Sequence, residues 1–162
     1  MINSYVSFAA FLLLVVAASL IGSSFNAGEW YNVTMQQPSV APPAWLFAVV
    51  WALVYVLMAL AAWKVWLTQH YSRLGVLTWW GLLLVLNISW SALFFGWHRP
   101  GWALALLGIT IVVAIYCTRA FSALSRPAAY LMGPYLGWIL FLWIFNLAVW
   151  TVNGGFLGRF FN

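Results

Sequence analysis

Residues 44–63 read AWLFAVVWALVYVLMALAAW, a stretch with no charged side chain. About 20 apolar residues in a helix cross the hydrocarbon core of a bilayer. Four further charge-free runs occupy residues 1–28, 74–98, 100–118 and 127–158. In lipid an isolated span must satisfy its own backbone hydrogen bonds, which a helix does and an open strand does not. The sequence therefore predicts an all-α integral membrane protein.

The overall composition supports this prediction. Hydrophobic residues make up 67% of the 162-residue chain, and only six basic and one acidic residue are present. A water-soluble domain would have roughly a quarter of its residues charged. We expect a bundle of five transmembrane helices that forms one domain over residues 1–162. The helices are predicted near residues 5–25, 44–63, 75–95, 101–119 and 128–151, with a long first loop at 26–43.

The basic residues indicate how the chain is oriented. Four lie on the side of the N-terminus and two on the other side: Lys64, Arg73, Arg119 and Arg126 against Arg99 and Arg159. Cytoplasmic loops carry the excess of Lys and Arg, so we expect a cytoplasmic N-terminus. The same residues are scattered at helix ends and form no patch, which argues against a nucleic-acid partner.

The few ionisable groups exclude several kinds of chemistry. Glu29 is the only acidic residue and lies in the first loop, so no predicted span contains Asp, Glu or His. A proton-coupled carrier needs a titratable group within the membrane. His70 and His98 lie in different loops, and Cys117 is the only cysteine. We therefore expect no metal site, no disulfide and no required cofactor.

Aromatic and amide residues recur at helical spacing in three of the predicted spans. The groups that share a face are Trp51, Tyr55 and Met58; Asn87, Trp90, Ser91 and Phe94; and Trp138, Leu142, Phe145 and Asn146. At about 1.5 Å per residue, most of them lie roughly 8–12 Å below the end that carries the first loop, and Trp138 lies at roughly 20 Å. Such walls could line a cavity for a flat apolar ligand. They could equally pack the bundle, with the amides bonding between helices.

Short motifs recur in a fixed order over most of the chain. They are Trp30-Tyr31, Gln37-Pro38-Ser39, Pro42-Pro43-x-Trp45, Val50-Trp51, Tyr55, Met58, Asn87, Trp90, Phe94-Phe95-Gly96, Gly101-Trp102-Ala103-Leu104, Pro134-Tyr135-Leu136-x-Trp138, Phe141 and Asn146. In their order and spacing these motifs resemble the TspO/MBR family, which includes bacterial tryptophan-rich sensory proteins, mitochondrial translocator proteins and the peripheral-type benzodiazepine receptor.

The resemblance implies a five-helix bundle, usually a homodimer, with a pocket under the first loop. It implies binding of porphyrins such as protoporphyrin IX and haem, of synthetic benzodiazepine-site drugs and, in some members, of sterols. For this chain it implies residence among the lipids of a bacterial cell membrane. The ligand-binding residues implied at matching positions are Tyr31, Trp51, Asn87, Trp90, Trp138 and Asn146.

Several positions depart from the family pattern. Gln37 stands where a basic residue is common, and Val40 stands where an aromatic residue is usual. The family's sterol-recognition segment has a Tyr and a basic residue where this chain has Leu147 and Thr151, which argues against sterol binding. Leu142 replaces a common alanine and should narrow the cavity.

Two functions remain open from the sequence. In the first, the protein is a membrane receptor or carrier that binds a tetrapyrrole and has a sensory or regulatory role. In the second, it is an enzyme that degrades bound porphyrin with light and oxygen, in which Trp51 and Trp138 are the oxidisable partners of the pigment. The second needs no acid–base residue, because the pigment itself supplies the excited state.

Overall fold

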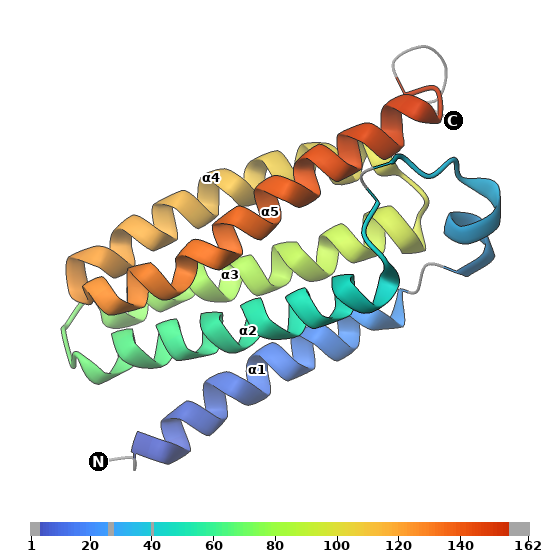
Figure 1. Cartoon of the computed structure of the whole chain (residues 1–162). Helices are drawn as coiled ribbons and strands as arrows, with labels where there is room; N and C mark the ends of the chain where they lie inside the picture. Colours follow the sequence, from blue (N-terminus) through green and yellow to red (C-terminus); the bar gives the residue numbers. More distant parts are fainter. Residues whose placement is uncertain (1–3, 26–27, 40, 156–162) are drawn as a thin grey trace.

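The chain folds as one bundle of helices (Figure 1). The computed structural model describes residues 4–25, 28–39 and 41–155, and no strand occurs in these ranges. Within them five helical spans are long and apolar enough to cross a membrane: α1 (Ser4–Ser24), α2 (Ala44–Leu67), α3 (Arg73–Ser91) with the turn that continues it to Gly96, α4 (Pro100–Leu124) and α5 (Arg126–Val152). Two π-helical turns accompany them, η1 (Trp30–Thr34) in the first loop and η2 (Ala92–Gly96) at the end of α3. The predicted all-α membrane fold is confirmed.

The last helix packs against two neighbours. α5 contacts both α4 and α2, and α3 contacts α4. α1 lies at the edge of the bundle against α2 and α3 (Figure 1). The first loop, the α3–α4 connection and the end of α5 gather at one end, which we call the loop end (Figure 1). The N-terminal side of α1 lies at the opposite end, as alternating antiparallel helices require.

Two helices are longer than the sequence predicted. α2 ends at Leu67 rather than at residue 63, and α4 ends at Leu124 rather than at residue 119. The prediction ended the first of these helices just before Lys64 and the second at Arg119, but both basic residues lie within helices. A long basic side chain can reach the headgroup region while its backbone stays helical, so the end of an apolar run is not the end of a helix.

Two connections are more ordered than expected. The predicted irregular loop at 26–43 contains η1, in which the Met35 N–H donates to the Trp30 carbonyl at 3.1 Å. Between α4 and α5 only Ser125 is not helical. Its hydroxyl oxygen accepts a hydrogen bond from the Ala128 N–H at 3.4 Å, which caps the start of α5. Short links of this kind keep consecutive helices in contact.

The core has two parts with different side chains. Towards the loop end lies what we call the aromatic cluster, made of Phe47, Trp51, Trp90, Phe94, Trp138, Phe141 and Phe145. The other part holds the small-residue core, made of Ala59, Ala61, Ala62, Ala114, Cys117 and Ala128, all of them 0% exposed. Small residues let helix backbones approach closely, which is the main source of helix association in lipid. Cys117 is part of this packing and is fully buried.

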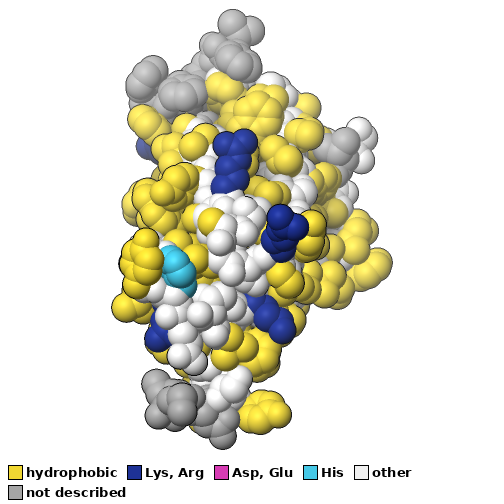
Figure 2. Space-filling model, turned by 90° about the vertical axis from the view of Figure 1, so that its left-hand side faces the viewer, with side chains coloured by type: hydrophobic (Ala, Val, Ile, Leu, Met, Phe, Trp, Pro, Cys, Tyr) yellow, Lys and Arg dark blue, Asp and Glu magenta, His cyan; other side chains and the backbone are white. Residues whose placement is uncertain are grey.

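Basic side chains lie at the end of the bundle opposite the loop end, at the termini of α2, α3, α4 and α5 (Figure 2). They are Lys64, Arg73, Arg119 and Arg126. The Arg73 guanidinium donates to the Trp66 carbonyl at 2.9 Å and lies 4.1 Å from the centre of the Trp66 ring. This contact joins the start of α3 to the end of α2.

Candidate ligand site

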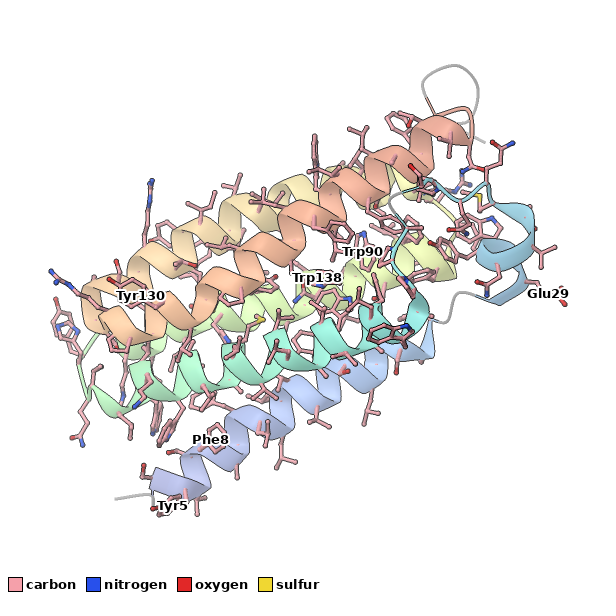
Figure 3. All side chains as sticks on the ribbon, viewed as in Figure 1. Tyr5, Phe8, Glu29, Trp90, Tyr130 and Trp138 are labelled. Atoms are coloured by element: carbon pink, nitrogen blue, oxygen red, sulfur yellow. The ribbon has the colours of Figure 1, made fainter. Side chains whose placement is uncertain are left out.

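Aromatic rings from three helices meet inside the loop half of the bundle. Trp51 of α2 lies 6.5 Å from Trp90 of α3 and 6.2 Å from Trp138 of α5, measured between ring centroids. Phe47, one turn before Trp51, contacts Trp90 at 6.5 Å and Trp138 at 5.5 Å. Figure 3 labels Trp90 and Trp138, which project between α2, α3 and α5. The faces predicted from helical spacing therefore do meet.

A polar contact lies directly beneath these rings. The Tyr135 hydroxyl donates to the Asn87 side-chain oxygen at 2.9 Å, and both residues are buried. The Asn87 side-chain nitrogen has no acceptor in the described part of the chain, and neither has the indole nitrogen of Trp138. An unpaired buried donor costs about 1–3 kcal/mol. Trp138 follows Tyr135 by three residues, so it lies about one turn, about 4.5 Å, further along α5 towards the loop end.

Asn146 holds the helices together at the upper side of the cluster. Its side-chain oxygen accepts from the Trp90 indole N–H at 3.1 Å, and its nitrogen donates to the Pro100 carbonyl at 2.8 Å. The side chain is 0% exposed. One amide thus links α3, α5 and the start of α4, and it fixes the plane of the Trp90 ring. In this arrangement Asn146 positions an aromatic wall.

Tyr31 reaches the site from the first loop. Its ring contacts Phe94 at 6.1 Å and Phe95 at 5.7 Å, both in η2. Gln37 donates to the Tyr31 backbone carbonyl at 2.7 Å. Burial raises the pKa of the Tyr31 phenol above its ordinary value, so the hydroxyl is neutral at physiological pH. Val40, the other departure expected near the mouth, lies outside the described residues.

The first loop is also fastened to the end of α5. The Gln36 backbone N–H donates to the Asn153 side-chain oxygen at 2.9 Å, and the Asn153 nitrogen donates back to the Gln36 carbonyl at 3.1 Å. On the neighbouring α3–α4 connection, His98 stacks on Trp30 at 4.3 Å with an interplanar angle of 12°. These contacts hold the first loop over the loop end of the bundle.

Sequence reasoning missed two residues of the site. The Phe47 ring contacts the rings of Trp51, Trp90 and Trp138. Phe47 precedes Trp51 by four residues, a spacing that could have indicated that the two share a helix face. Asn153 follows the last helical turn, and no local pattern marks it as an anchor for residue 36. Leu142, which was expected to narrow the cavity, is 0% exposed within the cluster.

Membrane-length helices, an aromatic interior with two unpaired donors and a fastened first loop define a polytopic membrane protein. A sequence model described as the TspO/MBR family matches residues 10–151. The chain belongs to the TspO/MBR family. Its fold and the matched range agree with the resemblance found in the sequence.

Relatives come from distant branches of life. The chain is 33% identical to tryptophan-rich protein TspO of Chlorobaculum tepidum, over 86% of this chain and 91% of that protein. It is 31% identical to protein CrtK of Rhodobacter capsulatus, over 91% of this chain and 93% of the relative. It is 34% identical to the translocator protein of Bos taurus, over 88% of each. These alignments span nearly the whole length of each relative.

Proposed function

We propose that this protein is a membrane receptor or carrier that binds a tetrapyrrole, such as protoporphyrin IX or haem, within the aromatic cluster and has a sensory or regulatory role. The single observation that carries the proposal is the pair of unpaired buried donors, on Asn87 and Trp138, among aromatic walls. A ligand that offers acceptors and a flat apolar body would satisfy both. The proposal also draws on the names of relatives, among them a tryptophan-rich sensory protein of Cereibacter sphaeroides and several translocator proteins.

The rings of the aromatic cluster suit a planar ligand once they rotate apart. Phe47, Trp51 and Trp138 contact one another at 5.5–6.4 Å, so a macrocycle needs these rings to rotate apart. Trp51 and Trp138 are half-buried, whereas Trp90 is 1% exposed and held by Asn146. We therefore assign Trp90 to the fixed wall and Trp51 and Trp138 to the movable one. Offset and edge contacts with aromatic rings stabilise a bound π system.

A second candidate function rests on one contact. Trp51 and Trp138 meet edge to face at an angle of 87°, so two oxidisable indoles would flank a pigment bound between them. This arrangement favours the light-dependent alternative, in which dioxygen adds to the bound porphyrin. The two functions share the same site and differ in whether a defined product forms.

The test is a titration of purified protein with protoporphyrin IX, followed by tryptophan quenching in the dark and then under illumination. We expect saturable quenching that weakens about tenfold in Trp138→Phe, which corresponds to about 1.4 kcal/mol and lies within the range for a lost hydrogen bond. Trp79→Phe is the matched control, because Trp79 contacts Tyr116 and lies outside the aromatic cluster. Equal affinities for the two variants would contradict the proposed site.

Illumination separates the two candidate functions. A single defined product that forms with the native protein but not with Trp51→Phe or Trp138→Phe would support the enzyme. Binding without turnover would leave a receptor or carrier. Absence of saturable binding would exclude the tetrapyrrole for this chain.

We further propose that the N-terminus is cytoplasmic. The four basic residues at the end opposite the loop end support this orientation, because cytoplasmic loops are enriched in Lys and Arg. Arg159, which was counted on the other side, lies outside the described residues. Cysteine labelling of Ser72→Cys in intact cells tests the orientation, and labelling by a membrane-impermeant reagent from outside would contradict it.

A further inference from the structure

A polar layer lies beneath the indole rings of the aromatic cluster. It consists of Tyr55 of α2, Asn87 of α3 and Tyr135 of α5, and we call these three residues the polar layer. Each lies one helical turn, about 4.5–6 Å, from a tryptophan of the cluster on its own helix, on the side away from the loop end. All three are buried. A ligand that enters the aromatic cluster from the loop end would therefore meet this layer at its inner edge.

The partners of the Asn87 amide decide which of its atoms a ligand would meet. The Tyr135 O–H donates to the Asn87 Oδ1 at 2.9 Å, and Tyr55 interacts with the same side chain. The Asn87 Nδ2 has no acceptor among the described residues. An amide can turn so that its oxygen and nitrogen exchange places. In the exchanged orientation the Tyr135 O–H would face the amide nitrogen and lose its acceptor. Tyr135 therefore favours the orientation that leaves the N–H groups of Asn87 for a ligand.

The second unpaired group of the site is also a donor. The Trp138 indole N–H has no acceptor in the described part of the chain, and Trp138 lies one turn from Tyr135 on α5. No residue of the aromatic cluster or the polar layer is charged, so an ionised carboxylate would be buried there without a cation, which is costly. A neutral acceptor, such as a carbonyl oxygen or an unprotonated ring nitrogen, has no such cost and suits both donors.

We propose that Tyr135 is a positioning residue that makes this site selective for flat ligands with a neutral hydrogen-bond acceptor at the buried edge. Tyr135 acts through Asn87: its O–H fixes the amide, and the amide N–H binds the acceptor. Acidic groups of the same ligand then stay towards the loop end. The inference rests on the proposed ligand site in the aromatic cluster, but it does not require that the ligand is a tetrapyrrole.

The test compares two flat tricyclic probes of nearly the same size. Fluorenone offers a carbonyl acceptor, and carbazole offers an N–H donor. The affinity of the purified full chain for each tritium-labelled probe is measured in one detergent. We expect the native protein to bind fluorenone about tenfold more tightly than carbazole.

Tyr135→Phe removes the hydroxyl that fixes the amide, so Asn87 can turn its oxygen towards a donor. The affinity for carbazole should rise about threefold, and the affinity for fluorenone should fall about threefold. A gain of affinity for one probe is a result that general damage to the fold would not produce. Tyr130→Phe is the matched control, because it makes the same change on α5 at a side chain that is 78% exposed. It should leave both affinities unchanged.

A double variant tests whether Tyr135 acts through the amide. In a protein that already carries Asn87→Leu, Tyr135→Phe should change neither affinity. Equal affinity of the native protein for the two probes, or an equal loss for both probes in Tyr135→Phe, would overturn the proposal. If Tyr135→Phe does not fold, Asn87→Leu decides, and an undiminished preference for fluorenone in that variant would also overturn it.

Titration of the native protein with protoporphyrin IX keeps this inference apart from the proposed function. Absence of porphyrin binding together with the expected probe affinities would contradict the tetrapyrrole and support the role of Tyr135. Porphyrin binding together with equal probe affinities would support the tetrapyrrole and contradict the role of Tyr135.

Discussion

The aromatic cluster and the small-residue core pack the helices of one bundle in opposite ways. In the small-residue core, fully buried alanines and Cys117 let the backbones approach closely. In the aromatic cluster, large rings such as Trp90 and Phe94 fill the space between the helices. A small side chain such as alanine has no part that can move, whereas an aromatic side chain can rotate. The difference assigns stability to one half of the bundle and adaptability to the other.

Two tryptophans make the contrast specific. The Trp80 indole N–H, next to the small-residue core, donates to the Met58 carbonyl at 3.1 Å. The Trp138 indole N–H, in the aromatic cluster, has no acceptor in the described ranges. The Trp80 indole thus has its hydrogen-bond partner within the bundle, and the Trp138 indole has none among the described residues. Unpaired polar groups in a well-packed fold are where a functional site is expected.

The largest expected effect comes from enlarging a small residue. Ala62 is 0% exposed, so Ala62→Leu should lower the free energy of unfolding by about 3 kcal/mol. Ala52→Leu, on an exposed face of the same helix, should change it by less than about 0.5 kcal/mol. Unfolding of both variants by denaturant in micelles measures the difference. Equal losses of unfolding free energy in the two variants would contradict the tight packing assigned to the small-residue core.

A matched pair of amide substitutions should separate structure from binding. Asn146→Leu leaves the Trp90 indole N–H and the Pro100 carbonyl without partners, and should cost about 2–3 kcal/mol. Asn87→Leu breaks one bond to Tyr135 but removes an unpaired donor, so it should cost about 1 kcal/mol. Porphyrin titration of the same proteins should show the larger loss of affinity in Asn87→Leu. A larger loss of stability in Asn87→Leu than in Asn146→Leu would contradict the roles assigned to the two amides.

Replacing Trp80 or Trp138 by Phe should show a smaller difference in the free energy of unfolding. Trp80→Phe should lower the free energy of unfolding by about 1 kcal/mol beyond the loss in Trp138→Phe, because only Trp80 loses a hydrogen bond. The two substitutions remove the same atoms from a ring. Their stabilities can be compared in one denaturation series, and identical values would indicate that Trp138 has a partner.

The smallest expected effect concerns the first loop. Asn153→Ala removes the two hydrogen bonds to Gln36 and should lower the free energy of unfolding by no more than about 1 kcal/mol. It should nevertheless speed amide hydrogen exchange in residues 30–36, because an unfastened loop opens more often. Ser122→Ala, whose hydroxyl bonds only within α4, is the control. Unchanged exchange would mean that the Trp30–His98 stack alone holds the loop.

Much of the fold follows from the sequence, because charge-free runs of membrane length leave few alternatives. Helix ends were predicted less well, since hydropathy reports where apolar side chains stop and not where backbone hydrogen bonding stops, as Lys64 and Arg119 show. Helical spacing grouped Trp51, Trp90 and Trp138 on faces that do meet. The unpaired donors could not be predicted, because the rotation of three helices decides which amide finds a partner. The roles of these residues in binding stay a prediction.

The pair formed by Gln36 and Asn153 also has a consequence for biosynthesis. The two residues are 117 positions apart, and Asn153 follows the last span. A chain is made from its N-terminus at about 5–20 residues per second, so the first loop is complete several seconds before its anchor exists. Throughout the insertion of the first four helices, the aromatic residues beneath that loop are uncovered within the nascent protein. The interior of this protein therefore stays accessible during synthesis until the end of α5 supplies Asn153, which fastens the first loop.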